Sequence, residues 1–160
     1  MILPEDDANR QIANGFVGHP SVNERKIQIL SPAAGWSKAL NRIQSDLAER
    51  LRQRRNAYLA LLIDFDGNYD DRREQFELAT PIELHDRVFV LGAKEEPESI
   101  RSSLRITLEK LGVALAEECL GGTTAYWSSP ALAHNKPDLD RFSTCPARVS
   151  IFQTDSPRQP

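Results

Sequence analysis

Residues 57–66 read AYLALLIDFD, an apolar run that ends in two carboxylates. A strand that is covered on both faces is apolar at nearly every position, so Tyr58 to Ile63 predicts a central strand of a parallel sheet. Asp64 and Asp66 follow directly, where this strand meets solvent. Because open α/β sheets bind ligands at the carboxyl ends of their strands, the two aspartates mark a candidate functional edge.

The sequence around this run alternates between strand and helix patterns. Leu40, Ile43, Leu47 and Leu51 recur at spacings of three and four, which is typical of the apolar face of a helix. The predicted strands are 1–4, 26–30, 58–63 and 87–91, and the predicted helices are 8–16, 37–54, 71–78 and a long one that ends near Cys119. Strands joined by helical crossovers predict the α/β class, with a doubly wound, mainly parallel four-stranded sheet flanked by helices.

The C-terminal quarter has a weaker pattern. Short helical stretches at 130–134 and 138–142 predict a small irregular cap over the sheet edge, and 153–160 predict a flexible tail. A chain of 160 residues with 40% hydrophobic content fits one domain, which we place at residues 1–152.

Composition narrows the classes of function. A formal charge of −3 and a pI near 5.6 argue against nucleic-acid binding through overall positive charge, although local patches and a bridging metal still allow it. The two cysteines, Cys119 and Cys145, show no metal-binding spacing and indicate a reducing, cytoplasmic location. No apolar stretch approaches the roughly 20 residues that span a bilayer, so we expect no membrane association.

A third carboxylate, Glu5, ends the first predicted strand. If the first and third predicted strands are neighbours, Glu5, Asp64 and Asp66 converge at one edge of the sheet. Carboxylates this close repel one another unless a cation joins them, and ligation by oxygen alone suits Mg²⁺ or Mn²⁺. The alternative is that Asp66-Gly67 simply forms a turn, because Asp-Gly is a strong turn signal.

The segments Met1–Glu5 and Leu61–Gly67 resemble the Toprim domain, found in topoisomerases, primases and nucleases that act beside ATPases in phage defence. In that family a Glu after the first strand and an Asp-x-Asp after the third hold one or two Mg²⁺ ions within a compact four-stranded parallel sheet. The resemblance covers about residues 1–100. Many members have Glu-Gly where this chain has Glu5-Asp6-Asp7, so either Glu5 or a following aspartate is the expected ligand.

This resemblance implies Mg²⁺-dependent phosphodiester chemistry on DNA or RNA, with Glu5, Asp64 and Asp66 as metal ligands and catalytic residues. Glu98 follows the fourth predicted strand, where acidic residues of nuclease members bind a second metal. Lys94 is in position to stabilise the transition state. The alternative is that Lys94 and Glu98 are simply solvated charged residues at the start of a helix. A chain this small needs a partner for substrate choice, either an ATPase or a second copy in a homo-oligomer.

Other readings stay open. An acidic pair after the first strand and Asp64 after the third also resemble a response-regulator receiver domain, in which Asp64 accepts phosphate. Receivers carry Ser or Thr after the fourth strand, where this chain has Gly92-Ala93. The motif from Asp64 to Asn68 also resembles that of haloacid-dehalogenase-like phosphatases, which place it after the first strand. A non-catalytic interaction subunit is the remaining alternative.

Overall fold

The computed structural model describes residues 1–123 and 125–152. Its sheet has three parallel strands in the order β1 (Ile2–Pro4), β2 (Leu59–Asp64) and β3 (Val88–Ala93). Leu3 pairs with Leu61, which in turn pairs with Val90 on the other side. The apolar run is therefore the central strand, and the first strand is its neighbour, as predicted.

The predicted four-stranded sheet is not confirmed within the described residues. The segment 26–30 contributes one isolated parallel bridge, between Ile29 and Ile2, and residues Glu24–Lys26 form the short 3-10 helix η1. The backbone N–H of Leu30 donates to the oxygen of Ile2 over 2.8 Å. Pairing stops there because β1 has only three residues and ends at Pro4, which has no N–H to donate.

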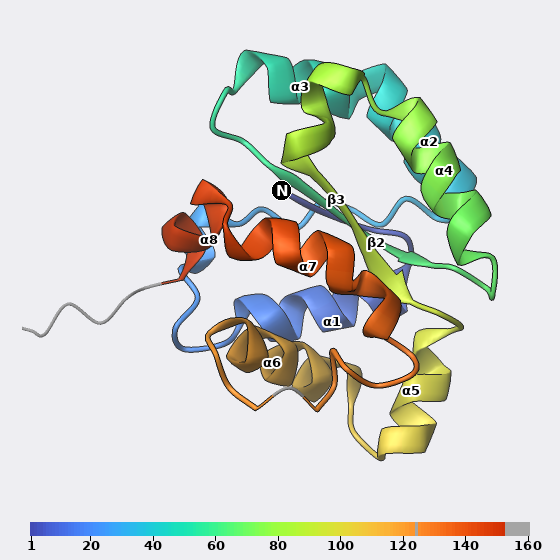
Figure 1. Cartoon of the computed structure of the whole chain (residues 1–160), viewed down its shortest axis with the longest axis vertical. Coiled ribbons are helices and arrows are strands. Elements are labelled where there is room, and N and C mark those ends of the chain that lie inside the picture. Colours follow the sequence, from blue (N-terminus) through green and yellow to red (C-terminus); the bar gives the residue numbers. More distant parts are fainter. Residues whose placement is uncertain (124, 153–160) are drawn as a thin grey trace, which may run out of the picture.

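One face of the sheet is covered by α2 (Trp36–Arg42), the π-helical segment η2 (Ile43–Leu47), α3 (Ala48–Gln53) and α4 (Tyr69–Ala79), as Figure 1 shows. The first three form one continuous helical stretch that matches the predicted helix at 37–54. The predicted apolar stripe faces inward, since Ile43, Leu47 and Leu51 are buried against Leu59, Leu61 and Ile63. This is the main hydrophobic core.

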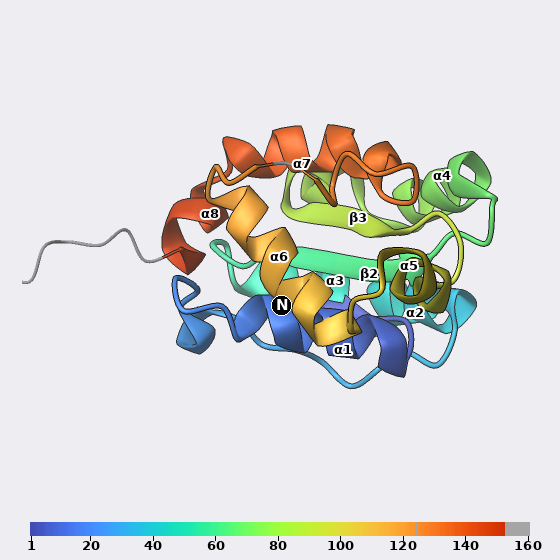
Figure 2. The ribbon, with the colours of Figure 1, turned by 90° about the horizontal axis from the view of Figure 1, so that it is seen from below.

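The opposite face is covered by α1 (Asp7–Val17), α5 (Pro97–Leu104) and α6 (Leu108–Cys119), which lie in front of the sheet in Figure 2. Helices α1 and α6 meet backbone to backbone: a Cβ on Gly15 would lie 1.9 Å from the oxygen of Glu109, and one on Gly112 would lie 2.0 Å from the oxygen of Ile12. Only glycine permits this approach.

The long helix predicted up to Cys119 is divided in two. Arg105 adopts a left-handed conformation, with φ +51°, and ends α5. Thr107 then caps α6, its side chain accepting a hydrogen bond from the N–H of Lys110 over 3.2 Å. A non-glycine residue in this conformation has no clear sequence signal, which is why the break was not predicted.

The predicted irregular cap is mostly helical. The 3-10 helix η3 (Ile82–Arg87) precedes β3, and η4 (Ala133–Asn135), α7 (Lys136–Ser143) and α8 (Pro146–Ile151) form the cap. Helix α7 lies against β3, with the rings of Phe142 and Phe89 in edge contact. The tail predicted at 153–160 lies outside the described residues. None of the described helices is both long and apolar enough to cross a lipid bilayer.

Candidate active site at the acidic edge of the sheet

Glu5 and Asp64 meet at the carboxyl edge of the sheet. Pro4 pairs with Leu62, so the next residue in β1 arrives beside the end of β2. The N–H of Asp64 donates to Oε2 of Glu5 over 2.8 Å, although the two residues are 59 positions apart in the sequence. Both residues are buried, with exposed fractions of 9% for Glu5 and 8% for Asp64.

Asn9 connects this pair to the start of α1. Asp6 caps the helix, and its Oδ1 accepts from the backbone N–H of Asn9 over 2.9 Å. The Asn9 amide donates to Oδ1 of Asp6 over 3.1 Å and to Oδ1 of Asp64 over 2.9 Å. Sequence reasoning missed Asn9. Its position three residues after a capping aspartate was the only available signal.

The carboxylates at this edge lack full charge compensation. Burial raises the pKa of Asp64 to about 7, and the negative charges of Asp6, Glu5 and Asp66 act in the same direction against the hydrogen bond from Asn9. Burial also raises the pKa of Glu5, while the N–H of Asp64 and the guanidinium of Arg72 lower it. A positive ligand would therefore be stabilised here.

Asp66 lies in the turn after β2 and is held by an arginine. It adopts φ +46°, and the N–H of Gly67 donates to the oxygen of Lys94 over 2.8 Å. The carboxylate of Asp66 is half exposed and forms an ion pair with Arg72 of α4. Arg72 also donates to the backbone oxygen of Asp64, and its guanidinium lies 5.1 Å from the ring centre of Trp36. Sequence reasoning did not identify Arg72.

The chemistry of these side chains fits a hard divalent cation, since every donor is a carboxylate oxygen and the local charge is negative. Their arrangement does not yet form a complete metal site. Among residues 1–123 and 125–152, no three His, Cys, Asp or Glu side chains form a group that could hold a metal ion. Oδ2 of Asp66 accepts from Arg72, and among the described residues no hydrogen bond reaches its Oδ1.

The other two predicted residues lie outside this cluster. Lys94 has an exposed side chain, and its backbone N–H donates to the oxygen of Ala131 over 3.0 Å. Glu98 is exposed in the first turn of α5. In the described part of the chain, neither side chain makes a hydrogen bond or ion pair with the three central acids.

His134 and Asn135 support the end of β3. The amide of Asn135 donates to the oxygen of Gly92 over 2.8 Å and accepts from its N–H over 3.0 Å, in the manner of a neighbouring strand. Nε2 of His134 donates to the same oxygen over 2.9 Å. His134 packs edge-on against Phe65 and Tyr69, and burial lowers its pKa, which favours the neutral ring. These contacts indicate a structural role.

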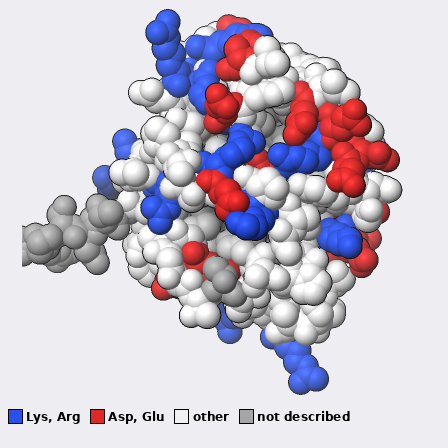
Figure 3. All heavy atoms as spheres, viewed as in Figure 1, with Lys and Arg blue, Asp and Glu red and all other residues white. Residues whose placement is uncertain are grey.

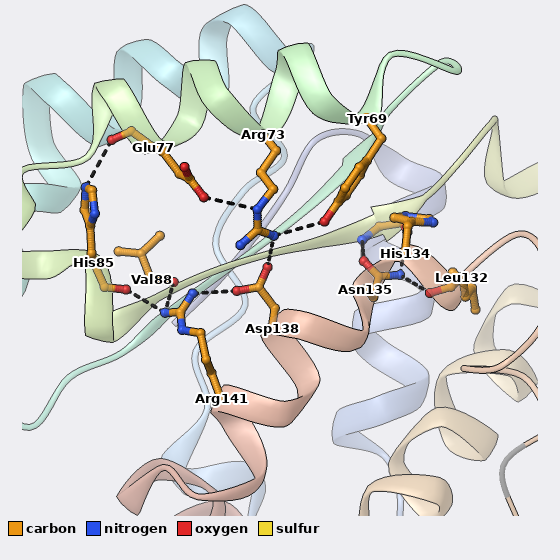
Figure 4. A network of polar contacts seen from close by, with 11 residues as sticks. Tyr69, Arg73, Glu77, His85, Val88, Leu132, His134, Asn135, Asp138 and Arg141 are labelled. Atoms are coloured by element: carbon orange, nitrogen blue, oxygen red, sulfur yellow. Dashed lines mark hydrogen bonds and ion pairs between the residues drawn. The ribbon is translucent and has the colours of Figure 1, made fainter.

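A second polar network lies between α4 and α7 (Figure 4). Asp138 is fully buried and accepts hydrogen bonds from Arg73 of α4 and from Arg141, the latter over 2.6 Å. Arg141 also donates to the backbone oxygens of His85 and Val88 over 2.6 and 2.9 Å. Two guanidinium groups surround this one carboxylate, so its charge is compensated inside the protein.

Comparison of the chain with models of protein families, with curated proteins and with solved structures finds no match. What this edge does must therefore be inferred from its own geometry and charge.

Proposed function

We propose that the acidic edge binds Mg²⁺ or Mn²⁺ and that the protein hydrolyses phosphodiester bonds of DNA or RNA, as a Toprim-like nuclease or nuclease subunit. The main support is the position of Glu5 beside Asp64, whose backbone N–H donates to Oε2 of Glu5 over 2.8 Å, together with the pKa of Asp64, which burial raises to about 7. A divalent cation supplies the charge that this edge lacks and, when bound, polarises a phosphodiester and activates water.

Within this proposal Glu5 and Asp64 would be the principal ligands of the cation, and Oδ1 of Asp66 would be a third. The guanidinium of Arg72, held against Trp36, would bind phosphate oxygens, for which its planar fork of donors is suited. Lys94 would meet the phosphate from the end of β3, and Glu98 would serve a second ion.

Substrate choice is proposed to need a partner. The net charge is −3, and on the face shown in Figure 3 basic and acidic side chains intermingle, with acidic ones gathered over α4. Such a surface gives little general attraction for a polyanion. A second copy of the chain, or an ATPase as in defence-associated members of the Toprim family, would supply the missing contacts.

Cleavage assays test the proposal. Supercoiled plasmid and a structured RNA are incubated with the protein in Mg²⁺, in Mn²⁺ and in EDTA. We expect metal-dependent cleavage that falls to the EDTA background in Asp64→Asn and is unchanged in Asp70→Asn. Asp70 is a matched control, because it is exposed in the first turn of α4 and its side chain has no partner among the described residues. Equal cleavage by both variants would reject the assignment.

A phosphoacceptor role for Asp64 is the second candidate, and one observation favours it: the Asn9 amide bridges Asp6 and Asp64, which brings an acid of the first strand end beside the presumed acceptor. Labelling by acetyl phosphate that is lost in Asp64→Asn would replace the nuclease proposal with this one. Metal binding at Asp64 with neither cleavage nor labelling would indicate an interaction subunit.

A further inference from the structure

The sheet face toward α1 and α6 is incompletely packed. On the opposite face, Leu59, Leu61 and Ile63 have no exposed surface. Ala60 and Leu62 alternate with them and stay partly exposed, although β2 has a neighbour on each side. Parallel sheets are normally covered on both faces, so the partial exposure of Ala60 and Leu62 beneath the helices requires an explanation.

A cavity of about 1030 Å³ lies over this face. Its floor is the sheet, and its roof includes residues of the two helices that meet backbone to backbone at Gly15 and Gly112. The lining is mainly apolar and includes Ile2, Ala60, Leu62, Leu91, Phe16 and Leu115. Small-molecule sites commonly measure about 300–1,000 Å³ and have this mainly apolar character. An apolar space of this size favours an apolar occupant over water.

Four cationic residues near the amino ends of the strands line the cavity. Arg25, Lys26, Arg54 and Arg55 are among its lining residues, and all four are exposed. Within residues 1–123 and 125–152 their side chains form no ion pair, and no Asp or Glu contributes to the lining. The charged residues that line the cavity are thus all positive, whereas the chain as a whole has a net charge of −3.

We propose that this cavity binds an anionic amphiphile. The apolar chain lies along the sheet, and a carboxylate or phosphate head group is held by the four cations. The floor extends from Tyr58 to Leu62, four steps of about 3.3 Å or roughly 13 Å in all, which suits a chain of about dodecyl length. Cys119 also lines the cavity, but burial raises the pKa of its thiol to about 11, so it stays protonated and binding is noncovalent.

Calorimetric titration of the full chain with defined probes tests this proposal. The probes are dodecanoate and dodecyl phosphate, below the concentrations at which they aggregate, with the uncharged monoglyceride of dodecanoate and with butyrate as references. We expect both anionic dodecyl compounds to bind about tenfold more tightly than the monoglyceride, and butyrate to show no binding. The ratio of the two anionic affinities distinguishes a carboxylate site from a phosphate site.

Two variants separate the head-group site from the chain site. Arg54→Gln/Arg55→Gln should weaken anionic binding about fivefold or more and remove the preference over the monoglyceride. Ala60→Phe should fill the floor and abolish binding of all dodecyl compounds, provided that circular dichroism shows a folded protein. Arg101→Gln/Lys110→Gln, at two exposed positions outside the cavity lining, should change nothing.

Several results would overturn the proposal. They are equal affinity for charged and uncharged dodecyl compounds, anionic binding that survives Arg54→Gln/Arg55→Gln, and binding that survives in folded Ala60→Phe. Sedimentation that shows the face closed by a second copy of the chain, with no probe bound, would also reject it. None of these results bears on cleavage at Asp64, so this proposal and the nuclease proposal can fail separately.

Discussion

Among the buried carboxylates of the described residues, those at Asp138 and those at the acidic edge have opposite electrostatic surroundings. Asp138 has no exposed surface and lies between Arg73 and Arg141. At the acidic edge, Glu5 and Asp64 lie together beside further acids, and burial raises the pKa of Asp64 to about 7. A buried carboxylate whose charge is compensated by the protein can remain ionised inside the fold, whereas one that lacks compensation is available to a ligand. We therefore assign structure to the first region and function to the second.

The largest change in the free energy of unfolding is expected for substitution of Asp138. Asp138→Ala removes the buried acceptor that Arg73 and Arg141 share, although Arg73 keeps Glu77 and Arg141 keeps two backbone oxygens. We therefore expect the free energy of unfolding to fall by about 3 kcal/mol. Urea denaturation measures the change. Asp140→Ala, on the same helix at an exposed position, is the matched control and should have little effect. A similar loss in both variants would remove the contrast between the two regions.

At high pH, Asp64→Asn should raise the free energy of unfolding, whereas Asp138→Ala lowers it. The folded-state pKa is raised from 3.8 to about 7, so the folded protein binds the proton more tightly than the unfolded chain, and stability falls as pH rises between about 4 and 7. The rise corresponds to at most about 4 kcal/mol, and we expect Asp64→Asn to gain about 1–3 kcal/mol at pH 8. The gain should vanish near pH 4.

Urea denaturation of wild type and Asp64→Asn across this pH range measures the effect. A constant difference between the two proteins from pH 4 to pH 8 would show that the carboxyl group of Asp64 is not held in its protonated form by the fold.

Divalent cations should stabilise the wild type at pH 8. A ligand that binds only the folded state at ten times its Kd adds about 1.4 kcal/mol to the free energy of unfolding. We expect this gain with Mg²⁺ or Mn²⁺ in the wild type and in Asp138→Asn, provided that this variant is folded, and its loss in Asp64→Asn. Stabilisation that persists in Asp64→Asn would place the cation elsewhere.

The smallest effect is expected at the helix cap beside the edge. Asp6→Ala removes the acceptor for the N–H of Asn9 and should cost about 1 kcal/mol. Asp6→Asn preserves capping and should be nearly neutral, because asparagine is an equally good cap. If both variants lose the same stability, the charge of Asp6 matters more than its hydrogen bond.

The sequence was sufficient for features that depend on local pattern. The unbroken apolar run from Tyr58 to Ile63 predicted a central strand, and the stripe from Leu40 to Leu51 predicted the helix that packs on it. The adjacency of β1 and β2, on which the meeting of Glu5 and Asp64 depends, was also predicted correctly.

Features that depend on contacts between distant residues were not predictable. Arg72 is one of several charged residues in α4, and its contacts with Asp64, Asp66 and Trp36 distinguish it. The segment 26–30 has a strand-like composition, yet the shortness of β1 limits its pairing to one bridge. The close approach of α1 and α6, whose residues line the cavity, depends on two glycines that are 97 positions apart (15 and 112).

The most direct test of the acidic edge is a Mn²⁺ titration followed by nuclear magnetic resonance. Paramagnetic broadening reports which amide groups lie near the bound ion. We predict that the resonances of Glu5, Asp64 and Asn9 broaden first, at Mn²⁺ levels well below one equivalent, while those of Lys26 and Arg54, near the opposite ends of the strands, are affected least, and that Asp64→Asn removes the effect. Broadening centred on another part of the molecule, or the same broadening in Asp64→Asn, would contradict a cation site between Glu5 and Asp64.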